Sequence, residues 1–181
     1  MASHDPHVDL DRPRSRVLRD PGFLRLWAAE TISHLGSSVT NLALPVVAIT
    51  LLDATPLQIA ILNLADFLPF LLIGLVAGVV VDRLPRRAIL IGGDLGRALL
   101  IATIPVAYLS GVLTLAHLML VGFAVGVLTV FFDVAYQSYL PNIVEHELLG
   151  PANSALETTN QFSRVGGPAF VGVLIDIVSA P

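Results

Sequence analysis

Three ionisable side chains, Glu30, His34 and Asp66, lie inside long apolar stretches of the sequence, where a charge is costly. Glu30 and His34 are four residues apart, which places them one above the other on one face of a helix. A carboxylate and an imidazole in a partly dry cavity can exchange a proton near physiological pH. The same spacing also fits a water-exposed pair at a helix end, and the pattern alone supports both interpretations.

Asp66 lies deeper, near the middle of its apolar stretch. An unpaired carboxyl group at such a depth favours its neutral, protonated form. We therefore expect Asp66 to be the main proton carrier, with Glu30 and His34 as further candidates.

A second set of ionisable residues includes Glu157 and Arg164, which are seven residues apart and so lie on one helix face, about 10 Å apart along the axis. We expect both to face a central cavity, where Arg164 would hold an anionic group of a substrate or the carboxylate of Asp66. A structural ion pair between Arg164 and an acid on another helix is the alternative. Asp94 and Arg97, three residues apart, are expected to form a local structural pair.

The composition indicates the kind of protein that holds these side chains. The 181 residues are 55% hydrophobic and 13% charged, with a mean hydropathy of +0.80, whereas a soluble domain has about a quarter charged residues. No Asp, Glu, Lys or Arg occurs between Ala98 and Phe132. This pattern excludes a water-facing globule and predicts membrane spans. Because cysteine is absent, disulfides and thiolate metal sites are excluded. We also expect no metal, no cofactor and no nucleic-acid partner.

We predict an all-α, polytopic membrane helix bundle that follows a flexible cytoplasmic tail over residues 1–22. About twenty apolar residues are needed to cross the hydrocarbon layer, and the predicted transmembrane domain, 23–181, offers five such stretches. The predicted helices are 26–52, 56–81, 88–109, 115–139 and 152–178. Glycines four residues apart let helices approach closely in lipid. Such pairs occur in three helices: Gly74 with Gly78, Gly92 with Gly96, and Gly122 with Gly126.

Basic residues predict the orientation, because arginine in short loops is retained on the cytoplasmic side. Arginines precede the first span and fill the loop between the second and third, whereas the loops after the first and third spans contain none. We therefore expect the amino terminus and the loop of Arg83, Arg86 and Arg87 to be cytoplasmic, in a multi-pass protein of the cell inner membrane.

The stretch GVVVDRLPRR, residues 78–87, closes the second span. It resembles the loop between helices two and three of the major facilitator superfamily, although it has valine and proline where that family usually has leucine and glycine. The resemblance implies a conformational latch between the two halves of a transporter, in which Asp82 faces a helix of the second half and Asp133 pairs with the arginines. Alternatively, these arginines only anchor the topology. The implied latch residues are Gly78, Asp82, Arg83, Arg86, Arg87 and Asp133.

The fifth span holds a second motif. Gly167, Pro168 and Gly172 match the helix-five motif of superfamily exporters, and Ser163 replaces a glycine of that motif. Residues 23–178 as a whole resemble the branch that contains bacterial siderophore and macrolide exporters. Members of the superfamily have two halves of six helices each. The resemblance therefore implies a truncated chain that lacks helix six and the second half.

The expected function is proton-coupled efflux of a small amphipathic molecule. Its partners would be the lipid bilayer, the substrate, protons and the missing second half. Two alternatives are a non-transporting five-helix membrane protein that assembles with another protein, and an intramembrane lipid-modifying enzyme. Such an enzyme needs several carboxylates on adjacent helical turns to hold a metal, and Asp94 has no such neighbours. We therefore expect a transporter without enzymatic activity.

Overall fold

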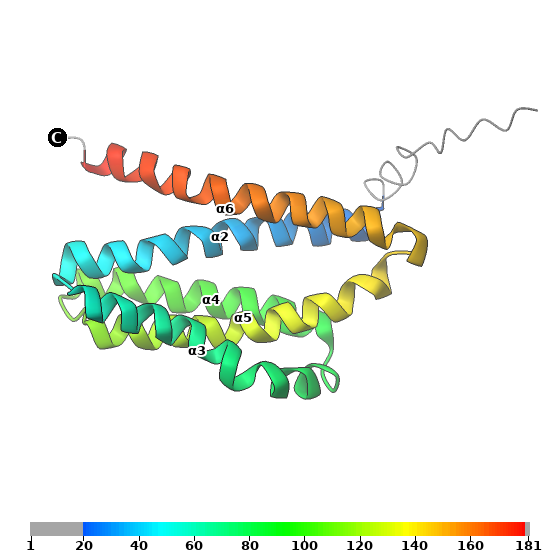
Figure 1. The fold of residues 1–181 in the computed structure, drawn as a ribbon, viewed down its shortest axis with the longest axis horizontal. Coiled ribbons are helices and arrows are strands. Elements are labelled where there is room, and N and C mark those ends of the chain that lie inside the picture. Colours follow the sequence, from blue (N-terminus) through cyan, green and yellow to red (C-terminus); the bar gives the residue numbers. More distant parts are fainter. Residues whose placement is uncertain (1–19, 180–181) are drawn as a thin grey trace, which may run out of the picture.

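The computed structural model describes residues 20–179, and it describes their side chains except at 142, 143, 146, 168 and 170–179. These residues form five long helices and one short 3₁₀ helix, with no strand in the part described (Figure 1). The predicted all-α fold is confirmed. The elements are α2 (Pro21–Leu52), α3 (Pro56–Val81), α4 (Arg86–Leu109), α5 (Leu115–Ile143), η1 (His146–Leu148) and α6 (Leu149–Ser179).

Capping side chains explain where the first helices begin. The carboxylate of Asp20 accepts hydrogen bonds from the backbone N–H groups of Gly22 at 2.7 Å and Phe23 at 3.4 Å. The helix α2 therefore starts before the predicted residue 26 and inside the predicted tail, the rest of which lies outside the described residues. Thr55 and Gln58 form a capping box at the start of α3, where the predicted boundary is confirmed.

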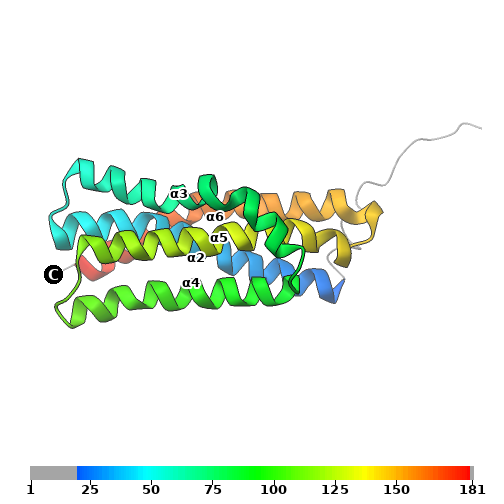
Figure 2. The ribbon, with the colours of Figure 1, turned by 90° about the horizontal axis from the view of Figure 1, so that it is seen from below.

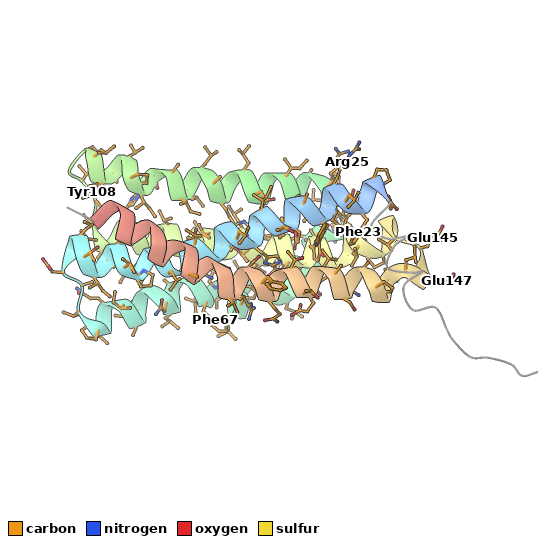
Figure 3. All side chains as sticks on the ribbon, turned by 90° about the horizontal axis from the view of Figure 1, so that it is seen from above. Phe23, Arg25, Phe67, Tyr108, Glu145 and Glu147 are labelled. Atoms are coloured by element: carbon orange, nitrogen blue, oxygen red, sulfur yellow. The ribbon has the colours of Figure 1, made fainter. Side chains whose placement is uncertain are left out.

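The helices form two groups that run along a common long axis. The helix α5 packs against α3 and α4, while α2 packs against α6 and joins the groups through contacts with α5 and α3 (Figure 1 and Figure 2). Because the connections are short, successive helices are antiparallel and the loops gather at two ends. Arg25, Glu145 and Glu147 lie at one end, and Tyr108 lies at the other (Figure 3).

Four helices, α2 to α5, are long and apolar enough to cross a membrane. Their outer surfaces carry large apolar side chains such as Leu75, which is 92% exposed, together with Leu71 and Leu109. Soluble proteins rarely leave such surfaces uncovered, so these faces are suited to lipid. The described part of α6 is not among the four, and its crossing remains a prediction.

Close contacts between helices occur at some of the predicted glycine pairs. A Cβ at Gly126 of α5 would collide with the backbone carbonyl oxygen of Asp66 in α3, and one at Gly96 of α4 would come 2.8 Å from a side chain of α5. Gly74 and Gly78 have no atom within 4 Å of such a Cβ. This pair therefore forms no close contact with the other described helices, because that face of α3 is turned away from them.

We predict that Gly126→Ala destabilises the bundle more than Gly122→Ala, one turn away on the same helix. A methyl group at Gly126 must displace the α3 backbone, and added volume in a packed contact costs about 1–3 kcal/mol. The nearest atoms to a Cβ at Gly122 are side-chain methyls 4.0 Å away. Thermal unfolding in detergent measures the difference, and equal melting temperatures for the two variants would contradict the contact at Gly126.

Candidate functional site

A cavity of about 860 Å³ lies between the two helix groups, and all five long helices contribute to its wall. One polar face of α2 reaches it through Ser33, Ser37 and Asn41, which are spaced four residues apart. Ionisable groups come to the wall from every helix. They are His34, Asp66, Asp94, Arg97, Asp133 and Arg164.

Glu30 and His34 contact each other on α2, as their spacing predicts. The Nε2 atom of His34 lies 3.2 Å from the Oε1 atom of Glu30. This contact is an ion pair when the imidazole is protonated. Glu30 is only 4% exposed, whereas the side chain of His34 is 33% exposed and lines the cavity, so the pair reaches water through His34.

Arg97 of α4 is the centre of a hydrogen-bonded group that joins α4 to α2, and it also contacts an aromatic ring of α5. Its guanidinium donates to Asp94 at 2.5 Å, to Ser33 at 2.8 Å and to Ser37 at 3.4 Å. Its Cζ atom lies 4.4 Å from the centroid of the Phe132 ring on α5. The predicted pair of Asp94 and Arg97 is confirmed, but it extends to α2 and α5. Beyond their four-residue spacing, nothing in the sequence marks Ser33 and Ser37 for this role.

Asp133 of α5 lines the cavity beside this group. Its carboxyl group interacts electrostatically with Arg97, Glu30 and His34. Within the described residues it forms no ion pair with the arginines of the 82–87 loop, so the predicted pairing is wrong. The reason is that α5 turns Asp133 towards charged groups of α2 and α4, whereas the arginines lie where α3 meets α4.

The other residues of the predicted latch lie where α3 meets α4. Gly78 accepts a backbone hydrogen bond from Asp82 at 3.1 Å, which ends α3. Asp82, Arg83 and Arg87 are exposed and Arg86 is partly buried. None of these four charged residues forms an ion pair within the described part of the chain, so each can bind a partner outside it. The latch stays a prediction.

Asp66 of α3 lines the cavity where α3 touches Gly126. The residue is half-buried, and its carboxyl group has no hydrogen bond or ion pair among the described residues. A carboxyl group without a partner at a cavity wall can bind water or a ligand. Its role as the proton carrier stays a prediction.

The helix α6 reaches the cavity through Asn160 and Arg164. Glu157 is instead exposed and accepts a hydrogen bond from Gln161 at 2.5 Å. The prediction that Glu157 and Arg164 both face the cavity is therefore wrong for Glu157. It lies about one helical turn nearer the η1 end than the cavity wall does.

The predicted helix-five motif lies where α6 crosses α2. A Cβ at Gly167 would come 2.6 Å from the Cβ of Ser38, so a glycine is needed for this approach. In the same interface, Trp27 Nε1 donates to Thr159 at 2.9 Å. The side chain of Pro168 and the surroundings of Gly172 lie outside the described residues.

A bundle of apolar helices around a polar, charged cavity is typical of multi-span membrane transporters. The chain matches the family described as transmembrane secretion effector over residues 16–181, and it belongs to this family of the major facilitator superfamily. The superfamily predicted from the loop motif is thereby confirmed.

Three relatives are similar to most of the chain. It is 31% identical over 154 residues to the Uncharacterized MFS-type transporter YfiS of Bacillus subtilis. The aligned region covers 85% of this chain and 36% of that protein. Macrolide efflux protein A of Streptococcus pyogenes is 27% identical over 157 residues, 86% of this chain and 38% of that protein. Multidrug efflux pump Tap of Mycolicibacterium fortuitum is 31% identical over 163 residues, 87% and 39% respectively. The chain thus spans less than two fifths of the length of these relatives. No solved structure matches it.

Neighbouring positions on α4 test whether the cavity holds water. Ala98 lines the cavity, whereas Leu99 is 62% exposed on the apolar outer surface. Because the chain has no cysteine, the cysteine introduced by Ala98→Cys or Leu99→Cys is its only thiol, and all labelling occurs at that position. We predict that a water-soluble thiol reagent labels Ala98→Cys at least about tenfold faster in membranes, since the reactive thiolate forms in water and not in lipid. Equal rates would contradict a water-filled cavity.

Proposed function

We propose that this chain forms part of a secondary transporter that exports a small amphipathic molecule in exchange for protons. The observation that carries the proposal is the cavity of about 860 Å³, into which every long helix sends an ionisable side chain. Membership of the transmembrane secretion effector family supports transport. The names of two relatives, a macrolide efflux protein and a multidrug efflux pump, favour export.

The lining of the cavity suits an amphipathic ligand. Small-molecule sites commonly enclose about 300–1,000 Å³ and combine apolar walls with a few polar groups. Here Phe70, Ile101 and Val125 provide apolar surface beside the charged residues. Arg164 is available for an anionic group of the substrate, because it has no ion pair within the described part of the chain.

Proton coupling needs a carboxyl group that changes protonation state as the cavity opens to either side. We infer that Asp66 is the main carrier, because its carboxyl group faces the cavity without a partner among the described residues. Glu30 and His34 are further candidates. Their contact on α2 provides an acid and a base beside the same cavity.

We propose that the end of the bundle with Arg25 is cytoplasmic, in the cell inner membrane. Arg25, Glu145 and Glu147 lie at this end (Figure 3). Because successive helices are antiparallel, the connection between α3 and α4, with the arginines of residues 83–87, lies at the same end. Basic loops are retained in the cytoplasm, and acidic residues weigh little in that rule.

We also propose that Asp82, Arg83, Arg86 and Arg87 form a latch with the rest of the longer transporter. The support is that their charges lack ion pairs within the described residues and that the loop resembles the superfamily motif. A role limited to anchoring the topology would need no partner for Asp82.

In the transporter as the cell makes it, we predict that Asp66→Asn abolishes proton-driven efflux. The amide keeps the size of the side chain but cannot load and release a proton. Substrate binding should stay within about tenfold of the unmodified protein, or about 1.4 kcal/mol. Efflux from membrane vesicles under an imposed proton gradient measures the first effect, and equilibrium binding measures the second.

Glu30→Gln is the matched comparison, because it neutralises the rival candidate carboxyl group, on α2, without changing its size. If Asp66→Asn keeps full proton-coupled efflux while Glu30→Gln loses it, the main carrier lies on α2. If both variants keep coupling, neither carboxyl group carries the proton.

A further inference from the structure

Arg97 is buried although its salt-bridge partner is not. The side chain of Arg97 is 8% exposed, whereas that of Asp94 is 39% exposed. A buried guanidinium costs free energy unless other charges and hydrogen bonds surround it. A simple surface pair on one helix would leave both side chains in water, so the burial of Arg97 indicates a role beyond this pair.

Asp133 supplies a second carboxyl group next to Arg97. The guanidinium stacks on Phe132, the residue before Asp133, and the carboxyl group of Asp133 has Arg97 and His34 as its cationic electrostatic neighbours. His34 is already engaged within α2. Arg97 therefore binds one carboxylate, that of Asp94, and interacts electrostatically with a second, that of Asp133, with which it forms no ion pair in the described residues.

The remaining ionisable groups do not take the place of Arg97. Of those that can be cationic, His34 is held by Glu30 at 3.2 Å, and Arg164 forms no ion pair with Asp133 among the described residues. The groups that face Asp133 or share its cavity wall come from every other helix: Glu30 and His34 on α2, Asp66 on α3, Asp94 and Arg97 on α4, and Arg164 on α6.

We propose that Arg97 is a positioning residue for proton exchange at Asp133, and that its guanidinium passes from Asp94 to Asp133 when Asp133 ionises. The proton leaves the carboxyl oxygen of Asp133 for water in the cavity, and Arg97 stays protonated throughout. Asp94 keeps the hydrogen bond that Ser33 donates at 2.8 Å, and its partial exposure lets water solvate it. This inference rests on the proposed function, because it adds a carboxyl group to the proton pathway.

The exchange changes which helices the guanidinium joins. In the structure it ties α4 to α2 through Ser33 and Ser37. Paired with Asp133, it ties α4 to α5. One proton thereby alters a contact between helices, and such a difference between two states is what coupling requires.

Infrared spectroscopy of the purified transporter in lipid nanodiscs tests the proposal, because it follows the carbonyl band of protonated carboxyl groups. The part of the band that is lost in Asp133→Asn belongs to Asp133. We expect this part to persist to a pH about one unit or more higher in Arg97→Gln, since a nearby cation favours the carboxylate. Arg97→Lys keeps the charge, so the pH at which Asp133 loses its proton should stay within about half a unit of that in the unmodified protein. Asp94→Asn releases the guanidinium and should move the midpoint to lower pH.

Removal of the Asp94 charge alone lowers the Asp133 midpoint, whether or not the guanidinium moves. Positioning therefore predicts that Asp94→Asn lowers the midpoint more when Arg97 is present than in the Arg97→Gln background, because only then can the released guanidinium pair with Asp133. An equal Asp94→Asn shift in both backgrounds, or no upward shift in Arg97→Gln, would overturn the proposal. If Arg97→Gln loses its helical content, Arg97→Met serves as the neutral background, with Arg97→Lys as the folded control. The titration needs neither substrate nor gradient, so its result can be interpreted even if the transporter shows no proton-coupled efflux. If efflux is proton-coupled but the predicted shifts are absent, only the proposed role of Arg97 is overturned.

Discussion

A charged side chain inside a bilayer needs a partner or water within the protein, because lipid offers neither. The described helices meet this constraint by dividing their surfaces. Leucine, isoleucine and valine cover the outer faces, while Asp66, Arg97 and Asp133 turn towards one cavity. Each of the five long helices thereby presents an ionisable residue to the same interior.

Close backbone contacts frame the cavity without filling it. The helices α3 and α5 meet at Gly126, and α2 and α6 meet at Gly167. Buried apolar clusters around Phe23 at one end and around Leu44 towards the other hold these pairs together. The space between the two groups stays open to small polar side chains of α2, which leaves room for water and ligand beside the charges.

Relations along one helix could be predicted from the sequence, whereas relations between helices could not. Helical spacing predicts the contact of Glu30 with His34, and the cap at Thr55 fixes the start of α3. The rotation of α5 decides that Asp133 faces Arg97 and not the loop arginines, and the packing of α6 leaves Glu157 outside the cavity. These rotations depend on tertiary packing, for which a single sequence holds no periodic signal. The superfamily could be recognised because its loop motif is local.

These helices are expected to cross the bilayer in alternation, with the end that holds Arg25 and the 82–87 loop in the cytoplasm. Fusions to a reporter enzyme that is active only outside the cytoplasm test this topology most directly. Activity is expected after Asp53, after Ser110 and after Ser179, and none is expected after Arg87 or Glu145. Activity after Arg87 together with none after Asp53 would invert the orientation and contradict the family's latch at that loop. Equal activity after Glu145 and after Ser179 would show that α6 does not cross.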